Sequence, residues 1–278
     1  MINENVQIQR AIQIALEEDI GSGDVTSNAT LPEDLVYNGR FLIKAPGIIA
    51  GLNVAELVFK TVDERIVLTN LVKNGTAVSP GDMIATISGP ARSLLTAERT
   101  ALNFMQRMSG IATLTHRFMV AVSATNAVIL DTRKTVPGLR AIDKMAVRQG
   151  CGQNHRTGLY DMVMIKDNHI AAAGGITTAV SRVRATDSAN LPIEVEVKNL
   201  AELEEVLPLN VDRVMLDNMS LDDMKEAVDR VNGRCQLEAS GNVTLDTVAA
   251  IAATGVDYIS SGALTHSVTA LDISLNFD

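Results

Sequence analysis

The sequence predicts an α/β protein with a small N-terminal α+β domain followed by an incomplete or barrel-like α/β domain. Three observations indicate this architecture. Residues 37–89 contain brief β-like runs separated by Pro-Gly and Asn-Gly turns. Residues 92–122 form one long helical pattern, which is a natural connector between domains. Further along, apolar runs that end in polar residues alternate with helix-like stretches, which is typical of parallel strands joined by right-handed crossovers.

The composition indicates an aliphatic core. Of the 278 residues 46% are hydrophobic, but only 3% are aromatic and eleven are Met, so aliphatic side chains and Met must fill the interior. No apolar run approaches the roughly 20 residues that a membrane span needs, and the N-terminus lacks the apolar region of a secretory signal. We therefore expect a cytoplasmic protein without a membrane partner. Cys151 and Cys235 have no CxxC partner, so free thiols are expected.

The N-terminal domain is expected to cover residues 1–105. It opens with a short amphipathic helix near residues 6–16, which Gly21 closes. Its strands are supplied by the runs FLIKA, IVLTNLV and MIATIS. Residues 268–278 alternate apolar and polar side chains, so we expect this C-terminal strand to return and pair with the N-terminal sheet.

The barrel domain is expected to cover residues 106–267. Six strands can be counted, in the runs AVILDTRK, DMVMIKDN, IEVEVKN, RVMLDN, CQLEASGN and DYISSGA. Six is fewer than the eight strands of a complete barrel. One further strand could lie around residues 174–184, which would still leave the barrel incomplete.

Positive charge is concentrated in one stretch of an acidic chain. The net charge is -9, yet the residues from Asp131 to Lys166 include seven Lys or Arg against three acids. A nucleic-acid or membrane surface would need a broad basic face, whereas a local cluster suits a small anion. We expect the partner to be a compact, highly charged metabolite and not a nucleic acid.

Polar residues that follow the predicted strands indicate where the chemistry lies. In a parallel barrel the carboxyl ends of the strands line one face, and that face carries the active site. Ser240-Gly241-Asn242 and Ser260-Ser261-Gly262 follow the last two strands, where barrels form a phosphate site. The alternative is that they only turn the chain. The strand-end residues are Asp131, Arg133, Lys134, Lys166, Asp167, Asn168, His169, Glu196, Lys198, Asp217, Asn218, residues 238–242 and residues 260–262.

The charged side chains on this face suit different tasks. Arg133 and Arg156 fit bidentate contacts to carboxylates or phosphates, whereas Lys134 and Lys166 act as point charges. His155, in a polar loop, is an anion donor or else a satisfied core histidine. A pair of acids, Glu196 and Asp217, suits Mg²⁺ or sugar hydroxyls, unless these are only exposed acids at strand ends.

These residues resemble the quinolinate phosphoribosyltransferase family, also called carboxylating nicotinate-nucleotide pyrophosphorylases. The resemblance runs over almost the whole chain, through EDIGSGDVTS, LLTAERTALNFMQRMSGIAT, DTRKTVPGLR, NHRTGLYDMVMIKDNHI, IEVEV, VMLDN, LEASGN and ISSGALTHS in that order. It implies an N-terminal α/β sandwich domain followed by an incomplete α/β barrel, the type II phosphoribosyltransferase fold. It also implies that quinolinate and phosphoribosyl pyrophosphate (PRPP) give nicotinate mononucleotide, pyrophosphate and CO₂ in NAD biosynthesis.

The resemblance also implies roles for individual residues. It makes Lys134, Glu196 and Asp217 catalytic, with Lys134 at the PRPP phosphates and the two acids near the ribose hydroxyls and Mg²⁺. Arg99 matches an arginine that the family contributes from the neighbouring subunit, so a homodimer is expected. The quinolinate carboxylates are expected at Arg133, His155, Arg156 and Lys166, and the 5′-phosphate at Ser240, Gly241, Asn242, Gly262 and His266.

Two departures and three alternatives accompany this resemblance. Val136 stands where the family usually has a second Thr, and Cys151 where a Gly-rich run usually continues. A class I aldolase is an alternative, because a desolvated Lys166 at a strand end could form a Schiff base. The others are a non-catalytic protein that binds PRPP or a dicarboxylate, and a paralogue tied to molybdenum transport. Retention of the full cation set favours quinolinate.

Overall fold

The computed structural model describes residues 3–186 and 189–278, which form two compact units. The first unit contains the residues up to His116 together with 135–151 and 265–278, and the second contains 117–134 and 152–264. Within the described residues, no helix is both long and apolar enough to cross a membrane.

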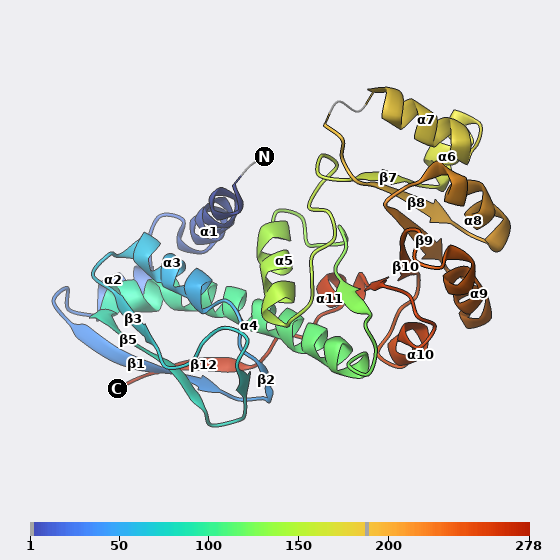
Figure 1. Ribbon diagram of the computed structural model, residues 1–278. Helices are drawn as coiled ribbons and strands as arrows, with labels where there is room; N and C mark the ends of the chain where they lie inside the picture. The colour runs from blue at the N-terminus through green and yellow to red at the C-terminus, as the bar shows by residue number, and fades with distance from the viewer. Residues whose placement is uncertain (1–2, 187–188) are drawn as a thin grey trace. The chain divides into compact units, whose positions relative to one another are not determined.

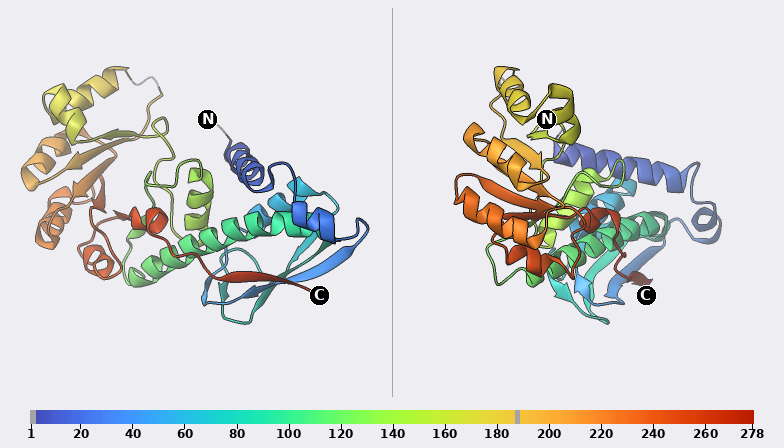
Figure 2. Two further views of the ribbon diagram at one scale, coloured as in Figure 1. Left: turned by 180° about the vertical axis from the view of Figure 1, so that it is seen from behind. Right: turned by 90° about the vertical axis from the view of Figure 1, so that its right-hand side faces the viewer.

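The first unit is built on an antiparallel sheet with strand order β12-β1-β5-β3 (Figure 1). Helices α3 and α4 lie on the same side of this sheet (Figures 1 and 2). The strands are β1 (Val36–Ile43), β3 (Val67–Asn70), β5 (Met83–Pro90) and β12 (Ile273–Phe277), with a small separate pair β2 (Gly47–Ile48) and β4 (Ala77–Val78). The helices are α1 (Glu4–Ile20), α2 (Val25–Thr30), α3 (Leu52–Val62), α4 (Ala91–Ala121) and α5 (Arg140–Gln149).

Aromatic and aliphatic side chains form the core of this unit. Phe41 on β1 and Phe59 on α3 are fully buried and meet edge to face, with ring centroids 6.2 Å apart. The returning C-terminal segment passes very close to α4. A Cβ added at Gly110 would lie 2.3 Å from the carbonyl oxygen of Thr269, so only glycine fits there.

The second unit is a six-stranded parallel sheet with strand order β6-β11-β10-β9-β8-β7, flanked by helices (Figure 1). The two outer strands β6 and β7 are not paired with each other, so the barrel is incomplete, as expected. The strands are β6 (Val128–Leu130), β7 (Val163–Ile165), β8 (Ile193–Val197), β9 (Arg213–Asp217), β10 (Gln236–Ser240) and β11 (Tyr258–Ser260). The helices are α6 (Asp167–Ala173), α7 (Ile176–Thr186), α8 (Leu200–Val206), η1 (Leu207–Leu209), α9 (Leu221–Val231), α10 (Val248–Ala252) and α11 (Ala263–His266), which ends in the first unit.

Alternation along the central strands separates an apolar face from a polar one. Val195 and Val197 on β8 are fully buried, as are Val214 and Leu216 on β9. Because successive strand residues point to opposite faces, the intervening residues lie on the other face. That face carries Glu194, Glu196, Arg213, Asp217, Glu238 and Ser240, which are the side chains of the site described below.

One expectation from the sequence is wrong. Residues 174–184 hold no strand, because they enter helix α7 after a turn at Gly174 and Gly175. The positive stretch is divided between the two units. Three of its seven cations, Arg140, Lys144 and Arg148, belong to helix α5 of the first unit, where Arg148 pairs with Glu4 at 2.7 Å. The expected domain boundary after residue 105 falls inside helix α4 and stays a prediction.

Candidate active site

The carboxyl ends of the parallel strands bring most of the expected site residues together in the second unit. Because these strands are parallel and adjacent, their ends meet at one edge of the sheet. The segment after residue 152 joins them, since Gln153 bridges to Leu130 on β6. The residues in this unit are Arg133 and Lys134 after β6, His155 and Arg156 before β7, Lys166 after β7, Glu196 on β8, Asp217 on β9, Ser240, Gly241 and Asn242 at the end of β10, and Gly262 after β11.

A buried aspartate anchors the segment that carries His155. The side chain of Asp131, directly after β6, is fully buried. Its Oδ1 accepts the main-chain N–H of His155 at 2.9 Å, and its Oδ2 accepts the side-chain amide of Asn154. An ionised acceptor makes such hydrogen bonds strong. Asp131 therefore fixes the chain just before Arg156 and does not face outward as a ligand.

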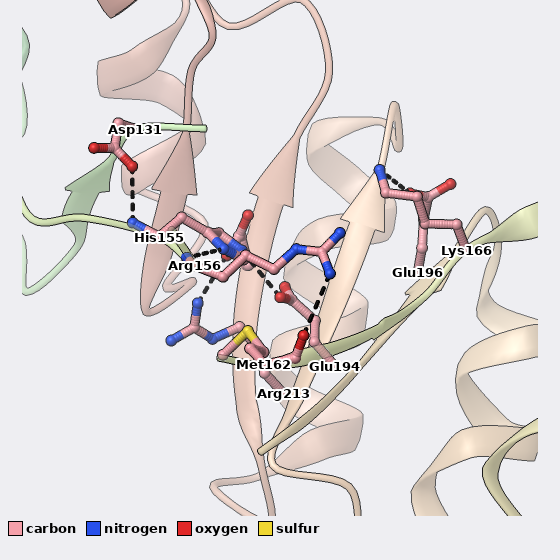
Figure 3. A network of polar contacts seen from close by, with 9 residues as sticks. Asp131, His155, Arg156, Met162, Lys166, Glu194, Glu196 and Arg213 are labelled. Atoms are coloured by element: carbon pink, nitrogen blue, oxygen red, sulfur yellow. Dashed lines mark hydrogen bonds and ion pairs between the residues drawn. The ribbon is translucent and has the colours of Figure 1, made fainter. Parts of the chain in front are cut away.

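His155 lies between two buried carboxylates, of which Figure 3 labels Glu194. Its Nε2 is 3.0 Å from Glu194 Oε2 and 3.3 Å from Glu238 Oε2, and only 4% of its side chain is exposed. Burial lowers the pKa of His155, but the two carboxylates outweigh burial and raise this pKa to about 9. His155 Nδ1 accepts the main-chain N–H of Arg156 at 2.7 Å.

Glu194 and Glu238 are buried on the inner face of the sheet. Burial and the neighbouring carboxylate raise the pKa of Glu194. Burial acts in the same direction on Glu238, but the bond to His155 and the charge of Arg213 outweigh it and lower the pKa of Glu238. Arg213 Nη1 lies 3.0 Å from Glu238 Oε2, and its guanidinium lies 4.0 Å above the ring of Tyr258. This cluster, His155 with Glu194, Glu238 and Arg213, is balanced by its own charges.

The sequence reasoning missed this cluster as a functional feature. It placed Glu238 among strand-end residues and gave no role to Glu194 or Arg213. The alternation of Glu and Val in the run IEVEV was the available signal, because it places both glutamates on one face of a strand. His155, Glu194 and Glu238 have the ligand types of a metal site. In this cluster His155 Nε2 lies beside Glu194 Oε2, and Arg213 Nη1 lies beside Glu238 Oε2.

Arg156 is held at the edge of this cluster. Its Nη1 donates to the carbonyl oxygen of Met162 at 3.3 Å (Figure 3). Burial lowers its pKa, and the positive charge of Arg133 adds to this, but a guanidinium stays charged at neutral pH. The next turn is fixed by Asp161, whose carboxylate accepts the N–H groups of Thr157 at 2.6 Å and Gly158 at 3.0 Å. Arg156 is therefore a cation in a preorganised loop.

Lys166 and Glu196 form an ion pair at the ends of β7 and β8. Lys166 Nζ lies 3.3 Å from Glu196 Oε2, and 44% of the lysine side chain is exposed. A Schiff-base lysine is activated by desolvation or by a neighbouring cation. Lys166 is half-exposed and its partner is a carboxylate, so the geometry disfavours the aldolase alternative.

The turn after β10 passes through left-handed backbone conformations. Gly241 has a φ of +100° and Asn242 a φ of +50°, so the chain turns through a region that favours glycine. Asn242 Nδ2 donates to Asn218 Oδ1 at 3.1 Å, and the Asn218 N–H donates to the Ser240 carbonyl oxygen at 2.9 Å. A Cβ at Gly241 would lie 2.2 Å from Asn218 Oδ1. The turns after β9 and β10 are thus fitted to each other.

Comparison with known proteins identifies the family. Residues 24–109 match the model of the quinolinate phosphoribosyl transferase N-terminal domain, and residues 111–276 match that of the C-terminal domain. The chain belongs to the quinolinate phosphoribosyltransferase family. It is 50% identical to quinolinate phosphoribosyltransferase [decarboxylating] 1b of Nicotiana tabacum, over 98% of this chain and 82% of that protein.

Further members of the quinolinate phosphoribosyltransferase family agree with this assignment. The carboxylating nicotinate-nucleotide pyrophosphorylase of Mycobacterium leprae is 46% identical, over 95% of each chain. The crystal structure of NadC from Streptococcus pyogenes matches with a TM-score of 0.94 at 41% identity, over 98% of each chain. The predicted fold class, a sandwich domain followed by an incomplete barrel, is confirmed by these structural neighbours.

Two residues expected from the quinolinate phosphoribosyltransferase family lie in the first unit. Arg99 is an exposed residue of helix α4. His266 ends helix α11 and is also exposed, with its Nδ1 2.6 Å from Ser267 Oγ. Their expected contacts to substrate stay predictions.

The acids expected to bind Mg²⁺ in the quinolinate phosphoribosyltransferase family fit a hard cation. Glu196 pairs in register with Met215, two residues before Asp217, so both carboxylates lie on the same face of neighbouring strands. Carboxylate oxygens are ligands that Mg²⁺ prefers, and two of them leave positions for water and substrate oxygens. The residues therefore fit the ion.

Proposed function

We propose that this protein transfers the phosphoribosyl group of PRPP to quinolinate with loss of CO₂. The products are nicotinate mononucleotide and pyrophosphate, in de novo NAD biosynthesis. The main support is the identity of 46–50% to relatives named for this reaction, over nearly the whole chain. The cations at the strand ends of the second unit supply matching chemistry, because quinolinate is a dicarboxylate and PRPP carries three phosphate positions.

The arginines are assigned to the quinolinate carboxylates. Arg133 and Arg156 can each form two parallel hydrogen bonds to a carboxylate, which fixes both the position and the plane of the ring. Lys166 adds a point charge. The pyridine nitrogen is a weak nucleophile, so holding it against C1 of the ribose is the main contribution of the pocket.

The remaining residues are assigned to PRPP. Lys134 contacts its phosphates, and the 5′-phosphate occupies the turns at Ser240, Gly241, Asn242 and Gly262, with His266 nearby in the completed site. Glu196 and Asp217 are assigned to the ribose hydroxyls and would hold Mg²⁺. The ion, when bound, supplies positive charge that stabilises the pyrophosphate leaving group. Lys134 stabilises the same charge from the protein side.

The chemistry then proceeds in two steps. The ring nitrogen forms a bond to C1 while the bond from C1 to pyrophosphate breaks, which leaves the nitrogen positively charged. The electrons of the bond between ring carbon 2 and its carboxylate pass to that ring as CO₂ leaves, and a proton takes the vacated position. The positive ring accepts these electrons, so the pocket needs to desolvate the carboxylate and needs no dedicated base.

The assembly and location expected from the sequence complete the proposal. Arg99 acts in the site of the neighbouring subunit of a homodimer, and the enzyme works in the cytoplasm. The exposure of Arg99 on α4 leaves it accessible to such a neighbour.

Release of labelled CO₂ tests this function. The protein is incubated with Mg²⁺ and quinolinate labelled in the carboxyl group next to the nitrogen, with and without PRPP. We expect PRPP-dependent CO₂ and nicotinate mononucleotide, and a loss of at least about 100-fold in kcat/KM in Arg156→Ala, since two charge-assisted hydrogen bonds are removed. Arg182→Ala, at an exposed position of α7, is the matched control. Binding without release by folded protein would favour the non-catalytic alternative.

A further inference from the structure

The ion pair of Lys166 and Glu196 joins two residues that have different ligands in the proposed function. Lys166 Nζ lies 3.3 Å from Glu196 Oε2, at the carboxyl ends of β7 and β8 (Figure 3). Lys166 is assigned to a quinolinate carboxylate, whereas Glu196 is assigned to the ribose hydroxyls of PRPP and to Mg²⁺. Each side chain already has a partner in the other, so every one of these ligands has to compete with the ion pair.

The sheet holds these two side chains opposite each other. Strands β7 and β8 are parallel, and Ile165 pairs in register with Val195, so Lys166 and Glu196 are the next residues in the same register. Only 10% of the Glu196 side chain is exposed, against 44% of the Lys166 side chain. A carboxylate with so little access to water depends on a nearby cation or on hydrogen-bond donors. When a ligand takes Lys166, Glu196 is therefore left short of positive charge.

We propose, on the basis of the proposed function, that this ion pair couples the binding of quinolinate to the binding of PRPP. Quinolinate draws Lys166 away from Glu196, and the released carboxylate then attracts Mg²⁺ and the ribose hydroxyls more strongly. Binding of PRPP with Mg²⁺ occupies Glu196 and in the same way releases Lys166 for quinolinate. Each substrate alone has to break the ion pair, but together they break it only once. The coupling is reciprocal, because both substrates act on the same contact.

A second ion pair at the same strand ends provides a comparison. Lys198 Nζ lies 3.0 Å from Asp167 Oδ2, and about half of each side chain is exposed. The pKa of Asp167 is lowered chiefly by its hydrogen bond to Lys198 and to a smaller extent by the charge of Lys166. Asp167 is thus a carboxylate that acts on Lys166 without being its partner. No ligand is assigned to Asp167 or Lys198, so this second pair does not link the two substrates.

The sign of the effect separates this coupling from direct repulsion between the substrates. Quinolinate is a dianion, and PRPP remains negatively charged with one Mg²⁺ bound. Like charges in neighbouring subsites repel, so without the ion pair each substrate should weaken the binding of the other. With the ion pair each should strengthen it. An ion pair with a half-exposed partner contributes up to about 1 kcal/mol, which corresponds to a tightening of about fivefold.

Phthalate makes the coupling measurable without turnover. It carries two neighbouring carboxylates like quinolinate but has no ring nitrogen, so it cannot be alkylated by PRPP. Titration calorimetry gives its Kd for the protein alone and for the protein saturated with PRPP and Mg²⁺. We expect phthalate to bind the wild-type protein about fivefold more tightly when PRPP and Mg²⁺ are present. An unchanged or weaker affinity would refute the proposal.

Two substitutions that each remove one negative charge show whether the ion pair is responsible. Glu196→Gln releases Lys166, so phthalate alone should bind this variant about fivefold more tightly than wild type, with no further tightening by PRPP and Mg²⁺. Asp167→Asn is the matched control, because it removes a carboxylate near Lys166 and leaves the pair of Lys166 and Glu196 intact. It should change the affinity for phthalate by less than about twofold and keep the wild-type coupling. Equal tightening in both variants, or full coupling in Glu196→Gln, contradicts the proposal.

Release of CO₂ from quinolinate by the wild-type protein is measured in parallel, so that the two proposals can fail separately. If CO₂ is released but no coupling is found, the ion pair does not link the substrates and the proposed function stands. If phthalate binds more tightly with PRPP and Mg²⁺ but no CO₂ is released from quinolinate, the proposed function fails and the link between the two subsites stands.

Discussion

Replacing Gly241 by alanine tests how closely the turn after β10, which is proposed to bind the 5′-phosphate, is fitted to the turn after β9. The φ of +100° costs an L residue about 1–3 kcal/mol. The new Cβ would also lie 2.2 Å from Asn218 Oδ1, and relieving such overpacking costs about 1–3 kcal/mol more. We expect Gly241→Ala to lose roughly 2–6 kcal/mol in total, a Tm lowered by at least about 4 °C, and a raised KM for PRPP.

A double-mutant cycle separates the two contributions. Asn218→Gly removes the clash and tolerates its own φ of +54°, at the cost of the 3.1 Å hydrogen bond with Asn242, about 1 kcal/mol. In the Asn218→Gly background, Gly241→Ala therefore costs only the backbone strain. The two substitutions should thus be coupled by about 1–3 kcal/mol, which is the free energy of the removed clash. Gly233→Ala is the control, because Gly233 has a φ of +75° and open space around it. Thermal unfolding and PRPP kinetics measure these effects. A wild-type Tm and KM in Gly241→Ala would refute the reasoning.

Three further predictions follow from the site and the loops around it. Arg99→Ala and Lys134→Ala should each be inactive. Mixing the two variants under subunit exchange should restore partial CO₂ release, since a mixed dimer has one intact site. No recovery of CO₂ release would count against a site shared between subunits. Cys151→Gly should raise the free energy of unfolding by up to about 1 kcal/mol, measured in urea, because Cys151 has a φ of +70°; a clear loss would be the contrary result. Burial raises the pKa of Asp161, but two main-chain hydrogen bonds outweigh it and lower this pKa below 3.8. The stabilisation by the Asp161 carboxylate is therefore present above pH 3.8 and is lost as the pH falls through the lowered pKa. The Tm difference between wild type and Asp161→Asn should shrink over that range, and a constant difference would show that ionisation of Asp161 is not responsible.

The sequence was sufficient to predict the strands and the residues at their ends. An apolar run followed by polar residues is a local pattern, so Lys166, Asp217 and Ser240 could be placed without knowing which strands are neighbours. The long helix α4 and the incomplete barrel were likewise predictable from period and strand count. These features depend on residues close together in the chain.

The buried charge cluster depends on long-range pairing and was not predictable in the same way. Glu194 on β8 and Glu238 on β10 meet at His155 because β8 and β10 are both neighbours of β9 in the sheet. No local sequence pattern predicts this strand order. Helix α5 shows the same limit. Its period indicates an amphipathic helix, but not that Asp143 would be buried in the first unit, where it accepts two hydrogen bonds from Arg107 at 2.9 and 2.8 Å.

The order of the segments along the chain has a consequence for folding. The second unit is complete at Leu264, whereas the first unit, which contains the N-terminal residues, still lacks β12. Gly39 on β1 pairs with Phe277, a contact between distant parts of the chain, and closing so long a loop is slow. During synthesis the unit that begins first is therefore finished last. Until β12 arrives, β1 is an open sheet edge on which another chain can pair, so aggregation should be most favoured just before β12 is made.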